Sequence, residues 1–114
     1  MQDNRYTQQD MNEGFVVAIH ITAKTNEGDA MEAILDRLVA PTMAEPGVKL
    51  FLPYRSPENP LDFFIFELYE DENAWDEHQQ TEHFQREIKE LLPRAESRQR
   101  IPFVPFASLK SSLQ

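Results

Sequence analysis

The chain has 114 residues, a formal net charge of -9 and no cysteine. This length suits one domain with a modest core. The negative charge disfavours phosphate backbones and anionic lipid surfaces, so nucleic acid and membranes are excluded as expected partners. Without cysteine there is no disulfide, thiolate nucleophile or cysteine-ligated metal centre. Residues 1–14 are polar and the apolar runs are strand-sized, which predicts neither a signal peptide nor a membrane span and, by default, a cytoplasmic location.

The first regular element is predicted to be a β-strand over residues 15–23. Apolar side chains occupy both of its faces, and His20 lies between small residues on one of them. We interpret His20 first as an ordinary strand residue and only second as a ligand-facing one. Apolar residues at helical spacing over residues 31–39 then predict an amphipathic helix. Pro41 is expected to kink or end it, and the Glu-Pro-Gly sequence at residues 45–47 stops any continuation.

Two strands over residues 48–54 and 62–69 are predicted to form a hairpin with a longer loop, and the second strand carries Glu67. Because apolar residues occupy both faces of this strand, Glu67 is expected to be buried. A buried carboxylate is costly unless a hydrogen-bond donor reaches it. His78 and His83, on the segment that follows, are the expected donors.

The segment after Tyr69 is predicted to hold two short helices, one capped by Asp71 or Asn73 and the next by Thr81, with the two histidines flanking the break. Residues 101–106 form the last predicted strand, and their two prolines place it at a sheet edge or a bulge. The order β-α-β-β-α-β predicts an α+β, ferredoxin-like βαββαβ fold, with helices on one face of an antiparallel sheet. The apolar second face predicts a sheet-to-sheet homodimer.

Over residues 15–106 the chain resembles the antibiotic biosynthesis monooxygenase (ABM) domains of the dimeric α/β-barrel superfamily. The resemblance rests on the opening strand, on the Glu-Pro-Gly sequence at residues 45–47 and above all on the segment from Glu67 to Phe84. That segment contains a glutamate, an aromatic residue two positions on and two histidines five residues apart; the aromatic residue is Tyr69, where many relatives have tryptophan. The expected organisation is an N-terminal extension over residues 1–14, an ABM-like domain over residues 15–108 and a tail over residues 109–114.

Relatives similar to quinol monooxygenases share this pattern, which implies a cofactor-independent monooxygenase that uses dioxygen and a small quinol-like or polyphenolic aromatic substrate. Such chemistry needs a base to form the phenolate and a dry pocket around the radical pair. A histidine held by a carboxylate is a suitable base, and a tyrosine hydroxyl can donate to an oxyanion. The candidate catalytic residues are His83, His78, Glu67 and Tyr69. The candidate substrate-binding residues are Phe63, Phe66, Trp75, Phe84 and His20.

Several alternatives stay open. The Glu67 and histidine set can be purely structural, and the fold can serve as a non-catalytic ligand-binding or stress-response dimer, an isomerase or a haem-binding oxygenase. A metal site from His78, His83 and Glu67 is disfavoured because the histidines lack i, i+4 spacing. With only three glycines and no phosphate-binding loop, we predict no flavin, nicotinamide or stoichiometric metal. Arg94, Arg98 and Arg100 are interpreted first as solvated surface and only second as a basic run that steers an anionic substrate.

Overall fold

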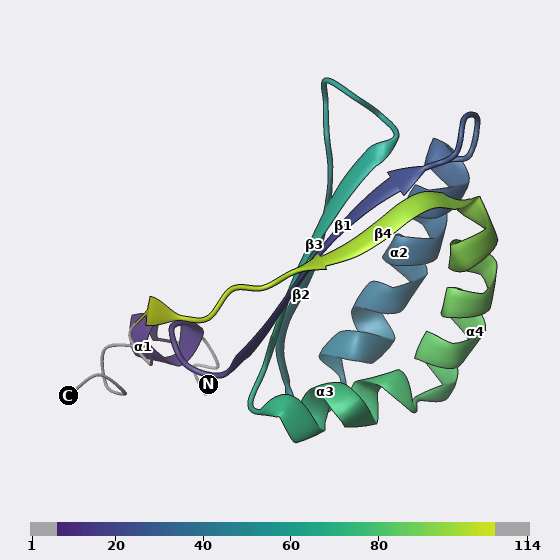
Figure 1. Ribbon diagram of the computed structural model, residues 1–114. Helices are drawn as coiled ribbons and strands as arrows, with labels where there is room; N and C mark the ends of the chain where they lie inside the picture. Colours follow the sequence, from purple (N-terminus) through teal and green to yellow (C-terminus); the bar gives the residue numbers. More distant parts are fainter. Residues whose placement is uncertain (1–6, 107–114) are drawn as a thin grey trace, which may run out of the picture.

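The computed structural model describes residues 7–106 and contains a four-stranded antiparallel sheet with the two long helices on one face (Figure 1). The strand order is β2-β3-β1-β4. The strands are β1 (Phe15–Ala23), β2 (Val48–Arg55), β3 (Asp62–Tyr69) and β4 (Ala95–Ile101). The helices are α1 (Gln8–Met11), α2 (Gly28–Met43), α3 (Glu72–Gln79), α4 (Glu82–Leu91) and the short 3-10 helix η1 (Leu92–Arg94). This arrangement confirms the predicted ferredoxin-like fold. No helix within residues 7–106 is both long enough and apolar enough to cross a membrane.

The core lies between the sheet and the helices α2 and α4 (Figure 1). Strands β1 and β3 occupy the centre of the sheet and pair in register, with Ile19 opposite Ile65. Alternation along each strand directs every second side chain to the helices. The buried residues from the sheet include Val17, Ile19, Ile21, Phe51, Phe63, Ile65 and Tyr69, which pack against Met31, Ile34, Leu35, Leu38 and Leu91. Each large apolar side chain buried in this way contributes about 1.5–3 kcal/mol of transfer free energy.

The break between α3 and α4 is created by side-chain caps, as the sequence predicts. The Asp71 carboxylate accepts a hydrogen bond from the Ala74 amide at 2.9 Å, and the Thr81 hydroxyl accepts one from the Phe84 amide at 3.2 Å. The Thr81 hydroxyl also donates to the His78 carbonyl at 2.7 Å. These bonds satisfy backbone groups that a helix end leaves unpaired. The caps therefore determine how the two histidine-bearing helices meet.

The predicted last strand is wrong in position, because the paired strand β4 covers Ala95–Ile101 and ends where residues 101–106 were expected to begin pairing. Pro102 and Pro105 lack the amide hydrogen that a ladder needs. Most side chains of β4 are polar and exposed, so the strand carries no apolar alternation that would reveal it. Its place at the edge of the sheet agrees with the prediction.

Two other segments are more regular than expected. Pro41 lies inside α2, which continues to Met43. Proline has no amide hydrogen, so one helical hydrogen bond is missing there, but only two helical residues follow it. Residues 8–11 form the short helix α1, and the Lys49 ammonium holds that region by donating to the carbonyls of Asp10 and Glu13 at 2.9 and 3.0 Å. Backbone acceptors of this kind leave no periodic signal in the sequence.

We expect the protein to form a homodimer through the uncovered face of the sheet. Leu52, Tyr54 and Phe64 are 36%, 54% and 37% exposed there, and the rings of Tyr54 and Phe64 stack with centroids 6.3 Å apart. An obligate interface of this type buries about 2,000 Å² in total. Phe64→Arg is expected to convert dimer to monomer in analytical ultracentrifugation, whereas Glu58→Arg in the hairpin loop leaves the mass unchanged. A monomeric wild-type protein at micromolar concentration would contradict the expectation.

Candidate functional site

Both histidines of the helix break converge on one carboxylate, that of Glu45, in the segment between α2 and β2. His78 Nδ1 and His83 Nε2 each lie 2.7 Å from the same oxygen, Glu45 Oε2. His78 comes from the last turn of α3 and His83 from the first turn of α4. The side chains of His78, Glu45 and His83 are 2%, 12% and 17% exposed. The cluster is thus anchored in the core at His78 and reaches solvent along one edge.

The predicted pairing of the histidines with Glu67 is wrong. Glu67 is buried, as expected, but its carboxylate accepts a hydrogen bond from the Tyr69 hydroxyl at 2.5 Å, and Glu45 is the partner of both imidazoles. Glu67 and Tyr69 are two residues apart on β3, so their side chains lie on the same face of the sheet. Glu45 precedes His78 by 33 residues and lies outside regular structure, so no periodicity connects the two.

A cavity of about 30 Å³ lies between the sheet and the helices, and His78 lines it. That volume has room for a water molecule. Its polar lining consists of His78, Glu67 and Arg98, and the remaining lining is apolar, including Phe84. Glu45 occupies Nδ1 of His78, and Nε2 has no hydrogen-bond partner among the described residues. The imidazole is therefore oriented by one nitrogen and available for chemistry at the other.

Burial governs the ionisation of these groups. It raises the pKa of Glu67 to about 7, against the hydrogen bond from Tyr69 and the nearby arginines, which lower it. Burial also raises the pKa of Tyr69 above its ordinary value, and the neighbouring carboxylate of Glu67 adds to the effect. For His78, burial lowers the pKa, while the Glu45 carboxylate acts in the opposite direction. The cavity is thus lined by an imidazole whose pKa is lowered and by a carboxyl group whose pKa is raised to about 7.

Of the five candidate substrate-binding residues, Phe84 is the one that the structure places at this cavity. Its ring meets the His78 ring edge-on, with centroids 5.0 Å apart. Trp75 packs on Phe15 with ring centroids 5.4 Å apart, outside the lining of the cavity.

The other three aromatic candidates also lie elsewhere. Phe63 lines a separate pocket beside α2. Phe66 and His20 belong to the uncovered face, because each alternates with residues that face the helices. His20 Nε2 lies 3.4 Å from the Asp62 carboxylate there. The sequence spacing therefore suggested one common substrate site for aromatic residues that the fold places in different regions.

Glu45 had no predicted role in the site, and Arg98 was assigned to the surface. Arg98 is exposed, in agreement with its interpretation as solvated surface, and it also lines the cavity from β4. The register of β4 explains this, because Arg98 pairs with Ile21 and Arg100 with Ile19, both of which face the helices. The Arg100 guanidinium lies 4.7 Å from the Trp75 ring centre, a cation–π contact. A strand predicted at residues 95–101 would have shown that Arg98 and Arg100 lie on the same face of the sheet.

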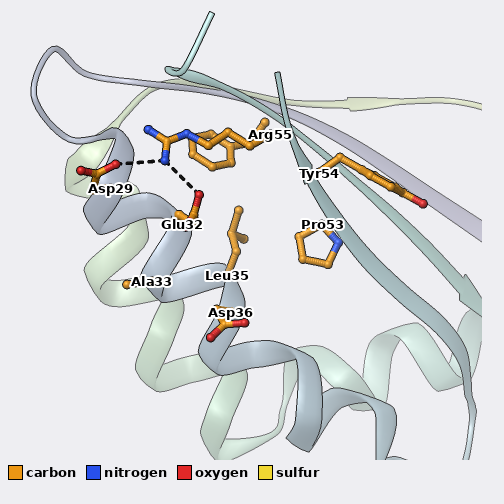
Figure 2. Close-up of a pocket in the computed structure, with 9 residues that line it drawn as sticks. Asp29, Glu32, Ala33, Leu35, Asp36, Pro53, Tyr54 and Arg55 are labelled. Atoms are coloured by element: carbon orange, nitrogen blue, oxygen red, sulfur yellow. Dashed lines mark hydrogen bonds and ion pairs between the residues drawn. The ribbon is translucent and has the colours of Figure 1, made fainter. Parts of the chain in front are cut away.

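A larger pocket of about 570 Å³ lies between α2 and β2, away from the histidines (Figure 2). Figure 2 shows Arg55 reaching across it to the carboxylates of Asp29 and Glu32, at 3.0 and 2.9 Å. The guanidinium also lies 5.2 Å from the Phe63 ring centre. The residues that line this pocket include no histidine, and Arg55 is already neutralised. We therefore place the candidate functional site at the histidine cluster, despite the smaller cavity.

The antiparallel sheet, the helices on one face and the histidine–carboxylate cluster at a helix break define a ferredoxin-like α+β protein. The family model for antibiotic biosynthesis monooxygenase matches residues 14–90, and the chain belongs to this family. The matched range includes Glu45, His78, His83 and the Glu67–Tyr69 pair, and it ends before Arg98.

Solved structures support the same fold. The protein PA3566 of Pseudomonas aeruginosa is 27% identical, with a TM-score of 0.74 over 78% of this chain and 90% of that chain. A Bacteroides thetaiotaomicron protein that is itself classed with the antibiotic biosynthesis monooxygenases is 26% identical, with a TM-score of 0.75 over 82% and 92% of the two chains. Rv0793 of Mycobacterium tuberculosis is 22% identical, with a TM-score of 0.69 over 78% and 93%. No curated protein matches the sequence.

Proposed function

We propose that the protein is a cofactor-independent monooxygenase that acts on a small quinol-like or polyphenolic aromatic substrate. The observation that carries this proposal is His78, whose Nδ1 is held by Glu45 while the ring lines an otherwise mostly apolar cavity. A carboxylate-oriented imidazole is a competent general base, and a mostly apolar lining that closes around a bound aromatic ring excludes water and limits side reactions. Membership of the ABM family supports the reaction class.

His78 Nε2 removes the proton from a phenolic hydroxyl, and Glu45 stabilises the imidazolium that forms. The phenolate passes an electron to dioxygen, and the resulting radical pair recombines to a peroxide on the ring. Loss of water leaves a hydroxyquinone, so one oxygen atom enters the product and the other leaves as water. The quinol itself supplies all the electrons, and no external reductant is needed. The cationic side chain of Arg98, at the cavity wall, favours the anionic oxygen species.

The substrate site requires a rearrangement at the rim of the cavity. A volume of about 30 Å³ holds a water molecule rather than an aromatic ring. Phe84 is only partly buried and Arg98 is exposed, so displacement of these two side chains enlarges the space without disturbing the buried strands. The proposal therefore places the ring of the substrate between His78 and the positions that Phe84 and Arg98 now occupy.

The test is a dioxygen-uptake screen with dihydroxybenzenes and dihydroxynaphthalenes, using protein treated with a chelator and free of flavin and haem. We expect uptake that depends on the quinol and matches the amount of product formed. Uptake that appears only after haem is added would assign the protein to the haem-binding alternative and contradict the proposal. Binding of the aromatics without uptake would contradict it as well, in favour of a ligand-binding role.

A further inference from the structure

We propose that Glu45, His78 and His83 also form a binding site for a divalent transition-metal ion, Zn²⁺ or Co²⁺ in type. Each side chain offers one donor atom, and the three donor atoms lie within 4.8 Å of one another. Two imidazole nitrogens and one carboxylate oxygen form a donor set typical of such ions. The proposal departs from the prediction that the protein binds no stoichiometric metal, which considered only Glu67 as the third ligand. Glu45, which comes from a distant segment, completes the set instead.

The carboxylate oxygen of Glu45 lies closer to the two imidazole nitrogens than ligands of one ion do, while the two nitrogens lie within 4.8 Å of each other. Both imidazole nitrogens lie 2.7 Å from Glu45 Oε2. In a tetrahedral site with bonds of about 2.0–2.1 Å, neighbouring donors lie roughly 3.3–3.4 Å apart. The carboxylate oxygen must therefore withdraw by somewhat more than half an ångström, roughly 0.6–0.7 Å, from each nitrogen. Glu45 lies outside helix and strand, where a side chain can make that shift without moving the sheet.

The surroundings favour an exchangeable ion over a closed structural one. Three protein donors leave at least one coordination position for water, as in zinc sites that are not purely structural. The side chains of Glu45 and His83 are 12% and 17% exposed, so an ion can enter from solvent at this edge. The net charge of the chain, -9, raises the local concentration of cations. With both imidazoles neutral, the Glu45 carboxylate compensates half of the charge of a divalent ion.

Metal binding and the base function of His78 exclude each other. An ion on Nδ1 needs the lone pair of that nitrogen, which places the imidazole proton on Nε2. The metal-loaded protein therefore lacks the unprotonated Nε2 on which the proposed reaction depends. The metal site itself does not rest on that reaction, because binding is measured without substrate.

The test is a titration of the chelator-treated full-length protein with Co²⁺, followed by its visible absorption and by calorimetry, and then competition with Zn²⁺. We expect saturation at one ion per chain, visible bands of a low-coordinate cobalt site and their loss as Zn²⁺ replaces Co²⁺. His83→Ala and the nearly isosteric Glu45→Gln are each expected to weaken binding at least tenfold. Circular dichroism of both variants confirms that they are folded.

The matched control is His20→Ala, which removes the third histidine of the chain from the uncovered face of the sheet. This variant is expected to bind Co²⁺ as the wild type does. Three outcomes overturn the proposal: no saturable binding by the wild type, unchanged affinity in folded His83→Ala and Glu45→Gln, or a loss of binding in His20→Ala equal to that in the cluster variants.

Discussion

Replacing His78 by glutamine is expected to lower the rate of dioxygen uptake about 10²- to 10⁴-fold, the usual contribution of a positioned general base. Glutamine retains an amide that can donate to Glu45, so that carboxylate keeps a polar partner, but it cannot accept a proton from a phenol. Binding of the aromatic substrate is expected to be nearly normal. Steady-state uptake per folded molecule, together with calorimetric titration of the substrate, measures the two effects separately.

The same assay distinguishes the two histidines. His83→Ala is expected to have a smaller effect than His78→Gln, because His83 bonds to the same oxygen of Glu45 but does not line the cavity. Gln80→Ala, at the exposed end of α3, is the control for disturbance of the helix break. Uptake at the wild-type rate in folded His78→Gln would show that the base lies elsewhere.

Glu67→Gln is expected to raise the free energy of unfolding, relative to the wild type, by more at alkaline pH than at acid pH. Burial raises the pKa of Glu67 from 4.5 to about 7, although Tyr69, Arg98 and Arg100 oppose the shift and Glu45 adds to it. The folded protein thus holds a proton that the unfolded chain releases between those two pH values. Wild-type stability from this group is complete below pH 4.5 and is lost as the pH rises through 7, by roughly 3 kcal/mol.

Glutamine resembles the protonated carboxyl and keeps an acceptor for the Tyr69 hydroxyl, so the variant avoids this loss. Denaturant unfolding at pH 5 and pH 8 measures the effect, and the variant is expected to gain on the wild type by roughly 2–3 kcal/mol between the two conditions. Glu70→Gln, at an exposed neighbouring position, is the control and should show no such pH dependence. An equal difference at both pH values would mean that Glu67 is ionised in the folded protein at pH 5 as well.

Much of the fold was predictable because local signals and packing agree. The strand over Asp62–Tyr69 has the observed bounds, since its apolar alternation is continuous and turn residues flank it. Asp71 and Thr81 cap the two helices where the sequence places them, because a short polar side chain before an apolar repeat satisfies free amides. Strand β4 was misplaced for the converse reason: an edge strand is held by backbone pairing, and its side chains need not alternate.

The site was less predictable than the fold. Both histidines and the buried glutamate on β3 were predicted from the sequence, but they were paired with each other because they are close in sequence. Glu45 reaches the histidines only through the tertiary fold, from the turn after α2. That turn was recognised as a helix end, which explains its proline and glycine and leaves its glutamate unassigned. A carboxylate in a loop has no periodic pattern that would show which way its side chain points.

The most direct test of the proposed function follows the oxygen atoms. Chelator-treated protein, free of flavin and haem, is supplied with a quinol that supports uptake under isotopically labelled dioxygen, and the product and solvent water are examined by mass spectrometry. The proposed reaction predicts one labelled oxygen atom in the hydroxyquinone and the other in water, with formation of labelled product reduced to background in His78→Gln. Unlabelled quinone formed together with hydrogen peroxide, at the same rate in the wild type and in His78→Gln, would contradict both the monooxygenase reaction and the role of the Glu45–His78 pair.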